Sequence, residues 1–302
     1  MKVAAFSEFG GPEVLRAMEM ETPEAGGGQV RVRVRAAGVQ PFDVAVRQGW
    51  TPPGVSGDLP RVPGNEFAGV VDQVGAGVTG FAPGDEVLGF DLLGCYAEYV
   101  VVPAENVTPK PAGMSWEVAG GFTAGTQTAH IALEQLGAGE GDTLLVHAAA
   151  GAVGTAAVQL ARSRGAVVIG TARQENHDYL RSLGAVPVAY GEGLEERVRA
   201  AAPGGVDAVL DGAGGEALDV SLRLVKPERI VTLVEHGRAA ELGVQTTRGV
   251  RLASRLAELA ELHVRGALAW HVRRAYPLER AAEAHREVEA RHGRGKVVLT
   301  VG

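Results

Sequence analysis

Apolar and polar residues alternate in short runs over the first hundred residues. Valines alternate with arginines in Gln29–Arg35, which predicts a strand with one buried face and one wet face. Glycine and proline punctuate Trp50–Gly64, which predicts a long irregular loop. Short β-rich runs separated by glycine and proline then occupy Ala68–Val87. This part of the chain therefore predicts a compact all-β module, either a barrel or a sandwich.

From about Trp116 the pattern changes to alternating helices and strands. The predicted helices cover Trp116–Leu136, a segment beginning at Gly151, Asn176–Leu183 and Leu194–Ala201, and the strands between them cover 144–146, Ala166–Gly170, Val186–Ala189 and Val206–Leu210. Repeated strand-helix-strand units imply a parallel sheet with helices on both faces.

The chain ends on a further helix and a further strand. A stripe of Leu252, Leu256, Leu259 and His263 predicts a helix that Gly266 stops. The apolar run 297–301 predicts a final strand. This strand and the initial β-module can close one domain, with the parallel sheet inserted between them. Such a topology leaves a cleft between two domains, where small-molecule sites tend to lie.

The segment Thr143–Gly154 is the most informative motif. An apolar strand runs into a turn of small residues that ends in Gly151 and Gly154, and a helical pattern follows at once. Such a turn lets the backbone approach a diphosphate, with free N–H groups of the helix start directed at the anion. Its glycine pattern is A-x-G-x-x-G rather than G-x-G-x-x-G, because the first position is Ala149. The context favours a dinucleotide site over an ordinary tight turn between strand and helix.

Composition narrows the functional class. The chain has 302 residues, of which 46% are hydrophobic and 22% charged, as in an ordinary globular protein with room for two domains. Its net charge of −7 argues against nucleic acid and anionic membranes as partners. One cysteine, Cys95, excludes an internal disulfide, and neither a signal peptide nor a long apolar stretch is visible. We expect a cytoplasmic protein.

Several motifs occur in a fixed order along nearly the whole chain. They are Ala37–Asp43 with Arg47 and Gly49, Pro63–Val71, Gly84–Val87, Gly94–Tyr99, Thr128-Ala129, His147–Gly154, Tyr276–Leu278, Ala281–His285 and Gly295–Leu299. Together they resemble the medium-chain dehydrogenase/reductase superfamily, in its zinc-independent, quinone-oxidoreductase-like branch. The chain departs from that pattern at Gln40, where the branch usually has asparagine, at Pro227–Arg229, and over the unfamiliar segment Val231–Gly243.

The resemblance implies an α/β plus β architecture. Residues 1–116 and 267–302 are expected to form a GroES-like β-barrel catalytic domain. Residues 117–266 are expected to form an inserted Rossmann domain with a doubly wound parallel sheet. The resemblance to this family also implies a homodimer.

The resemblance further assigns candidate site residues. The side chains expected near the substrate are Gln40, Asn65 and Arg47. The residues expected to bind the dinucleotide are Thr128, Ala149, Gly151, Ala152, Val153, Gly154, Thr171, Arg173, Tyr190 and Gly212. Each substrate candidate also has a structural interpretation: the two amides can hold loops together, and Arg47 can pair with a surface carboxylate. We interpret Asp43 as a structural residue that ties its turn through backbone hydrogen bonds.

No metal is expected. Zinc-dependent relatives use a Cys and a His at the positions that this chain fills with Gln40 and Asn65, and amides are poor zinc ligands. Glu66 alone does not make a site, and Cys95 has no second cysteine for a structural zinc loop.

The cofactor is predicted to be NADPH. Sites for NAD carry an acidic residue about 20 residues beyond the glycines, at the end of the second strand. The resemblance places Ala172 at that position, followed by Arg173, whose guanidinium suits a 2′-phosphate. Tyr190 resembles the family tyrosine near the adenosine ribose. Glu175 keeps NAD open, and Arg173 can also be a solvated surface residue.

These features predict hydride transfer from NADPH, without a metal, to a small-molecule quinone or α,β-unsaturated carbonyl. A conjugated acceptor needs only weak polarisation at its oxygen, which backbone N–H groups or an amide can supply. Two alternatives stay open. One is an enoyl-thioester reductase, and the other is an NADPH-binding protein with little turnover.

Overall fold

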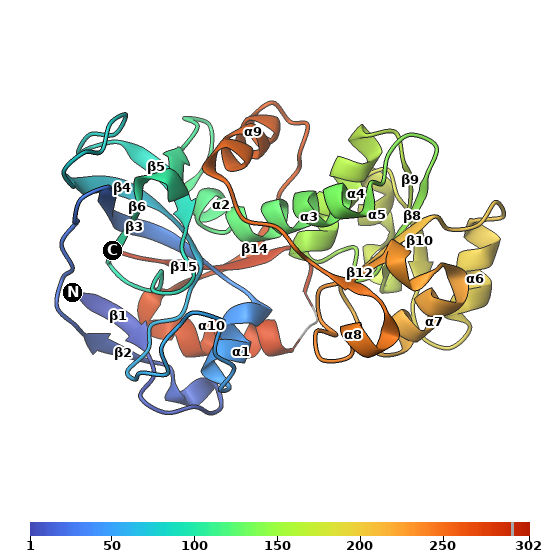
Figure 1. Ribbon diagram of the computed structural model, residues 1–302, viewed down its shortest axis with the longest axis horizontal. Coiled ribbons are helices and arrows are strands. Elements are labelled where there is room, and N and C mark those ends of the chain that lie inside the picture. Colours follow the sequence, from blue (N-terminus) through green and yellow to red (C-terminus); the bar gives the residue numbers. More distant parts are fainter. Residues whose placement is uncertain (291–292) are drawn as a thin grey trace. The chain divides into compact units, whose positions relative to one another are not determined.

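The computed structural model describes residues 1–290 and 293–302. The chain divides into two compact units. The first comprises Met1–Ala124 and Arg251–Gly302, and the second comprises Gly125–Val250, so that the second is inserted in the sequence of the first (Figure 1). None of the described helices is long and apolar enough to cross a membrane.

The first unit is built on an antiparallel sheet. Its strands are β1 (Lys2–Ala5), β2 (Arg16–Glu19), β3 (Gln29–Val39), β4 (Glu66–Val74), β5 (Glu86–Phe90), β6 (Tyr99–Pro103), β7 (Val107–Pro109), β14 (Val272–Pro277) and β15 (Lys296–Thr300). The strand order in the main sheet is β14-β15-β3-β4-β5-β7, with β6 also paired to β3, while β1 and β2 form a separate pair. Among the described strands of this unit, β14 and β15 pair in parallel and the other pairs are antiparallel.

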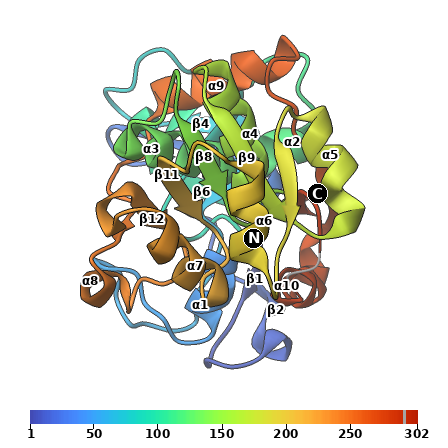
Figure 2. The same cartoon turned by 90° about the vertical axis from the view of Figure 1, so that its right-hand side faces the viewer.

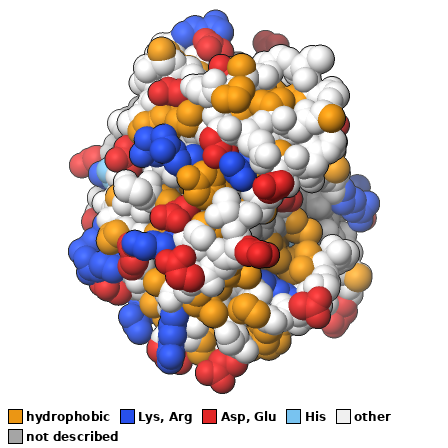
Figure 3. Space-filling model, turned by 90° about the vertical axis from the view of Figure 1, so that its left-hand side faces the viewer, with side chains coloured by type: hydrophobic (Ala, Val, Ile, Leu, Met, Phe, Trp, Pro, Cys, Tyr) orange, Lys and Arg blue, Asp and Glu red, His pale blue; other side chains and the backbone are white. Residues whose placement is uncertain are grey.

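Strand β3 is the centre of this sheet and shows the expected alternation. Its valines at 30, 32 and 34 are buried in the core, whereas its arginines are exposed or partly exposed. The core between the strands also includes Phe6, Phe67 and Tyr96. On the face of the molecule that Figure 3 shows, acidic and basic side chains are interspersed and leave no broad area of one charge.

Five of the described helices belong to or begin in the first unit. They are α1 (Pro41–Arg47), α2 (Trp116–Gly120), α3 (Thr123–Leu136), α9 (Ala253–Val264) and α10 (Ala281–Glu289). The sequence prediction placed α9 in the inserted domain, because its boundary was drawn at residue 266. In the structure, α9 groups with the first unit. Its His263 ring contacts the Phe122 ring, with 5.7 Å between the ring centroids. The contacts therefore divide at 124/125 and 250/251 rather than at 116/117 and 266/267.

The second unit is a doubly wound parallel sheet. Its elements are β8 (Thr143–Val146), α4 (Ala152–Ser163), β9 (Val167–Ala172), α5 (His177–Ser182), β10 (Val186–Ala189), α6 (Leu194–Ala201), β11 (Ala208–Asp211), α7 (Glu216–Leu224), β12 (Ile230–Thr232), α8 (Ala239–Leu242) and β13 (Gln245–Thr246). The strand order is β10-β9-β8-β11-β12-β13, and these described pairs are all parallel. Figure 2 shows β9, β8, β11 and β12 of this sheet. The order reverses between β8 and β11, and ligands of such sheets bind at the carboxyl ends of the strands at that point.

Candidate functional site

The ends of three neighbouring strands in the first unit bring four polar side chains together. Gln40 follows the last residue of β3, Asn65 and Glu66 stand at the start of β4, and Lys296 opens β15. Because β4 and β15 both run antiparallel to β3, their first residues lie beside its last ones. We call these four residues the amide cluster.

A buried ion pair holds the amide cluster. Lys296 Nζ lies 2.5 Å from Glu66 Oε1, and the two side chains are 2% and 0% exposed. The contact is an ion pair rather than a directed hydrogen bond, since Glu66 Oε1 has no hydrogen-bond partner among the described residues. Glu66 Oε2 accepts a 2.6 Å hydrogen bond from the Ala124 N–H in the first turn of α3, where a helix favours a negative charge. A β-carbon at Gly38 would lie 1.9 Å from Glu66 Oε1, so the carboxylate needs a glycine there.

A chain of hydrogen bonds links the amides of Gln40 and Asn65 to this ion pair. Lys296 Nζ donates to Gln40 Oε1 over 3.1 Å. Gln40 Nε2 in turn donates to Asn65 Oδ1. The backbone carbonyl of Asn65 accepts a 2.8 Å hydrogen bond from Arg251 Nη1. The structure thus brings Gln40 and Asn65 together.

Asp43 supports the loop around the amide cluster, as its structural interpretation predicted. Its carboxylate accepts hydrogen bonds from the Gln40 N–H (3.0 Å), the Gly64 N–H (3.2 Å) and the Tyr96 hydroxyl (3.0 Å). Burial raises the pKa of Asp43 to about 7, and Lys296, Tyr96 and the Gln40 N–H oppose that shift. Asp43 therefore fixes the backbone on which Gln40 stands.

Arg47 is engaged away from the two amides. Its side chain is fully buried, and its guanidinium donates to the Gly10 carbonyl oxygen, to His285 Nδ1 and to Glu289. These contacts tie α1 to α10 and to the N-terminal segment. The structure therefore pairs Arg47 with a carboxylate, as the structural interpretation predicts, but the arginine is buried rather than at the surface, and it does not contact Asn65.

Two buried histidines should make stability depend on pH. Burial, with Arg47 nearby, lowers the pKa of His285 to about 3, and burial lowers that of His147 to about 4. The unfolded chain takes up these protons below about pH 6.5, whereas the folded chain does not. Each histidine should therefore make the free energy of unfolding fall by about 1.4 kcal/mol per pH unit as pH drops from 6.5 toward 4, whereas Asp43, whose pKa is raised to about 7, contributes in the opposite direction over the same range.

The variant His285→Gln tests this assignment by urea unfolding between pH 6.5 and 4.5. It should remove about 1.4 kcal/mol per pH unit from the slope, because glutamine does not titrate there. The control His236→Gln changes an exposed residue and should keep the wild-type slope. If the free energy of unfolding has the same pH slope in wild type and in His285→Gln, His285 does not contribute to the pH dependence.

In the second unit, the start of α4 presents unpaired backbone donors. Gly151 is the N-cap of α4, and the N–H groups of Ala152, Val153 and Gly154 donate to no backbone carbonyl in the described part of the chain. A β-carbon at Gly154 would lie 2.5 Å from Ala148 O and 2.6 Å from Ala149 Cα. The turn before α4 thus fits closely under the helix and leaves its N–H groups available to an anion.

His147 holds the strand ends beside this turn. The Ser221 hydroxyl donates to Ala217 O over 2.7 Å, so its oxygen accepts from His147 Nε2 at 2.9 Å. His147 Nδ1 is then the acceptor for the Thr171 hydroxyl at 3.0 Å. The neutral ring links β8, β9 and α7. The side chain of Thr171, a predicted cofactor residue, is therefore committed to an internal hydrogen bond, and Thr171 is 2% exposed.

Arg173 and Tyr190 form an exposed pair at the ends of β9 and β10. Arg173 Nε donates to the Tyr190 hydroxyl over 2.9 Å, and Arg173 Nη1 lies 4.0 Å from Glu175 Oε1. The two side chains are accessible, at 39% for Arg173 and 52% for Tyr190, whereas Ala172 before them is buried. The hydrogen bond to Tyr190 raises the pKa of Arg173 above its usual value. The structure thus brings these two predicted residues together.

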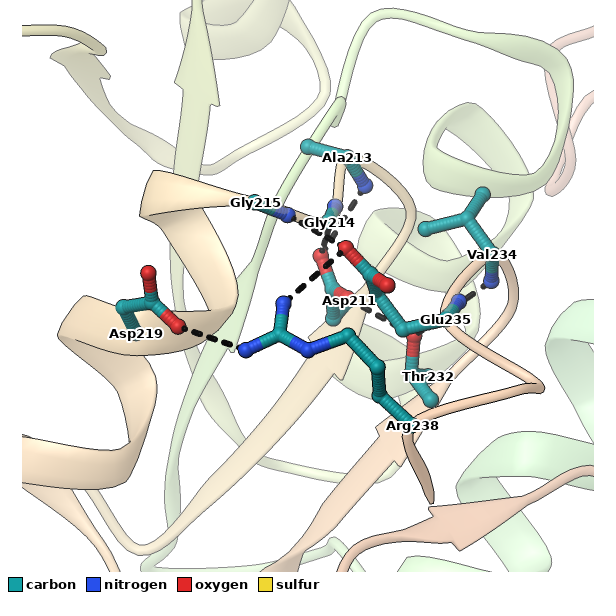
Figure 4. Close-up of polar contacts among 9 residues, drawn as sticks. All are labelled: Asp211, Ala213, Gly214, Gly215, Asp219, Thr232, Val234, Glu235 and Arg238. Atoms are coloured by element: carbon teal, nitrogen blue, oxygen red, sulfur yellow. Dashed lines mark hydrogen bonds and ion pairs between the residues drawn. The ribbon is translucent and has the colours of Figure 1, made fainter. Parts of the chain in front are cut away.

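The unfamiliar segment after β12 folds onto the turn between β11 and α7 (Figure 4). Asp211 Oδ1 accepts from the N–H groups of Ala213 (2.9 Å) and Gly214 (2.8 Å), and its other oxygen accepts from the Thr232 hydroxyl at 2.8 Å. Glu235 Oε1 accepts from the Gly215 N–H at 2.8 Å. The three backbone N–H groups of this turn are therefore already hydrogen-bonded to carboxylates of the protein. A β-carbon at Gly212, a predicted cofactor residue, would lie 3.1 Å from His147 O, so β8 and β11 approach closely there.

The remaining predicted cofactor residues lie near these elements. Ala149 is fully buried and its N–H donates to Thr171 O over 3.0 Å. Thr128 lies in α3 and is partly exposed. Within residues 1–290 and 293–302, no three His, Cys, Asp or Glu side chains are grouped closely enough to hold a metal ion.

The sequence analysis does not identify Lys296 as part of the amide cluster, or Arg251 as the residue that binds the Asn65 carbonyl. Lys296 lies in the motif Gly295–Leu299, whereas Arg251 lies in none of the motifs. One signal was available: Lys296 and Glu66 are opposite charges, each followed directly by an apolar run. Charges in such positions are buried only when they are paired.

Two family models match the chain. The alcohol dehydrogenase GroES-like domain matches residues 26–112, and the zinc-binding dehydrogenase family matches residues 183–299. A spectinabilin polyketide synthase system protein, NorB of Streptomyces orinoci, is 37% identical over 300 residues, which are 91% of this chain but 13% of that protein. The chain thus spans a small part of that synthase.

Solved structures match end to end. The quinone oxidoreductase of Coxiella burnetii is 32% identical, with a TM-score of 0.91 over 100% of this chain and 99% of that one. The Escherichia coli quinone oxidoreductase complexed with NADPH is 28% identical, with a TM-score of 0.85 over 99% and 100%. With the inserted Rossmann-type sheet and the GroES-like unit, these matches show that the chain belongs to the medium-chain dehydrogenase/reductase superfamily, in its quinone-oxidoreductase-like branch.

Proposed function

We propose that this oxidoreductase uses NADPH to reduce quinones or α,β-unsaturated carbonyl compounds without a metal ion. The observation that carries the proposal is the amide cluster, in which Gln40 and Asn65 are hydrogen-bonded to each other. Thiolate or imidazole ligands are missing from these two positions, while neutral amide donors are present. An amide suits an acceptor whose oxygen takes on charge through conjugation.

The second unit supplies a fitting place for the dinucleotide. Gly151, with the free N–H groups of Ala152, Val153 and Gly154, offers donors to a diphosphate. When bound, NADPH supplies the two electrons and one hydrogen of the reduction. The side chains of this protein bind and orient it, and Asn65 is proposed to stabilise charge at the acceptor oxygen.

Arg173 supports NADPH rather than NADH. A guanidinium forms paired, charge-assisted hydrogen bonds with a phosphate, and Arg173 is accessible beside Tyr190. Glu175 is the group that would favour NADH, but its carboxylate is already 4.0 Å from Arg173. The solved E. coli relative in complex with NADPH also supports this choice.

Replacing Arg173 with alanine should weaken NADPH binding by about 10- to 100-fold, the worth of a hydrogen bond to a charged group. NADH binding should hardly change, since NADH lacks the 2′-phosphate. Fluorescence titration with both cofactors measures the effect. Arg181→Ala is the matched control, because Arg181 is an exposed arginine on α5 that pairs with Asp178. Equal losses for both cofactors in Arg173→Ala would refute the role.

A second candidate is reduction of an enoyl thioester. The similarity to polyketide synthases favours it, because a conjugated thioester accepts hydride at its β-carbon as an enone does. A panel of quinones, enones and enoyl thioesters, followed by the absorbance of reduced nicotinamide, separates the candidates. Turnover with quinones and enones supports the main proposal. Turnover with enoyl thioesters alone supports the second, and NADPH binding without turnover contradicts both.

A further inference from the structure

The chemistry of Lys296 fixes the orientation of the Gln40 side chain. An ammonium group has three donors and no acceptor. The Gln40 atom that lies 3.1 Å from Lys296 Nζ is therefore its oxygen, and its NH₂ group points the other way. Because Lys296 is buried beside Glu66, this contact is sheltered from competing water.

The orientation of the Gln40 amide in turn determines that of the Asn65 amide. Gln40 Nε2 can only donate, so the Asn65 atom that faces it is Oδ1. Asn65 Nδ2 then points away from Gln40. It has no hydrogen-bond partner in the described part of the chain, and it is not among the fully buried polar atoms. Its two N–H bonds are available to a ligand.

We propose that Lys296 and Gln40 are positioning residues that make Asn65 present an N–H donor, never its carbonyl oxygen, to the acceptor. This inference rests on the proposed function. An N–H donor at this position favours acceptors whose oxygen becomes negative during reduction, such as enones and quinones. With an enone, hydride from NADPH adds to the β-carbon, the C=C electrons move to form an enolate, and NADP⁺ is left. Asn65 Nδ2 donates to the enolate oxygen, and solvent then protonates the α-carbon.

The substitution Gln40→Glu reverses this chain of hydrogen bonds while keeping the size of the side chain. A carboxylate still accepts from Lys296, but its second oxygen also needs a donor. Asn65 must then turn its NH₂ group toward residue 40 and present Oδ1 to the acceptor. We expect the turnover rate with 2-cyclohexen-1-one to fall by about 100-fold, as when an oxyanion donor is removed. NADPH affinity should be unchanged.

The substitution Gln40→Met is the matched comparison. It removes both amide groups, so Asn65 is free to take either orientation, and we expect a smaller loss of about tenfold. A merely structural role for Gln40 predicts the opposite order, because glutamate keeps the contact with Lys296 and methionine loses it. Thermal unfolding shows whether both variants fold. If Gln40→Glu fails to fold, a wild-type rate in Gln40→Met overturns the proposal.

A spectroscopic measurement reads the orientation without turnover. Carbonyl-labelled 2-cyclohexen-1-one is bound to the complex of the protein with NADP⁺, and its C=O stretch is measured by difference infrared spectroscopy. The stretch should lie at lower wavenumber in wild type than in Gln40→Glu, because only wild type donates to the oxygen. If wild type reduces no enone, the proposed function fails. If wild type reduces it but Gln40→Glu matches wild type in rate and stretch, this inference alone fails.

Discussion

Gly154→Ala is expected to weaken NADPH binding by about 100-fold or more, the effect of shifting a binding group by about 1 Å. The new β-carbon would lie 2.5 Å from Ala148 O and 2.6 Å from Ala149 Cα, both backbone atoms that cannot rotate away. The start of α4 must therefore move off the turn. The same strain should lower the free energy of unfolding by about 1–3 kcal/mol. Fluorescence titration with NADPH and urea unfolding measure the two effects.

Two further glycines serve as comparisons for this prediction. Gly204→Ala adds a β-carbon with nothing within 4 Å, so both binding and stability should stay at the wild-type level. Gly151→Ala meets only Ala148 O, at 3.3 Å, so the fold should persist while the methyl group obstructs the diphosphate. Unchanged NADPH affinity in both Gly151→Ala and Gly154→Ala would place the dinucleotide elsewhere.

Lys296→Met is expected to lower the free energy of unfolding by about 3–5 kcal/mol, because it leaves a buried carboxylate without its partner. Glu66 is fully buried, and its remaining partner is the N–H of Ala124. The double variant Lys296→Met with Glu66→Gln should recover most of the loss, since it removes both charges. Urea unfolding at pH 7 measures all three proteins.

The exposed ion pair of Lys2 and Glu279 provides the control. Their side chains are 55% and 51% exposed, so Lys2→Met should cost less than about 1 kcal/mol. A cost for Lys296→Met no larger than that for Lys2→Met would mean that the Glu66 carboxylate is not held by Lys296.

The second unit could be predicted closely from sequence because its signals are local. The predicted helix Leu194–Ala201 coincides with α6, and the predicted Asn176–Leu183 differs from α5 by one residue at each end. The helical pattern predicted after Gly151 is likewise found as α4, whose buried residues include Ala156, Ala157 and Leu160. Helical periodicity and glycine turns act over a few residues, so a single sequence contains them.

The amide cluster could be predicted only in part because its contacts are distant in sequence. Lys296 is 256 residues from Gln40, and Asp43 is 53 residues from Tyr96. The sequence pattern does not predict the short helix α1, in whose first turn Asp43 accepts a hydrogen bond from the Gln40 N–H. Arg47 looked like a substrate residue because nothing local shows that His285 and Glu289 receive its guanidinium. The homodimer stays a prediction.

The most direct test identifies the carbon atom of the substrate that receives the hydride. The wild-type protein is incubated with NADPH that carries deuterium at the nicotinamide C4, together with 2-cyclohexen-1-one, and the product is examined by NMR and mass spectrometry. The account predicts cyclohexanone with one deuterium at C3 and none at the carbonyl carbon. An allylic alcohol labelled at the carbonyl carbon, or no transfer of label to any enone or quinone offered, would contradict it.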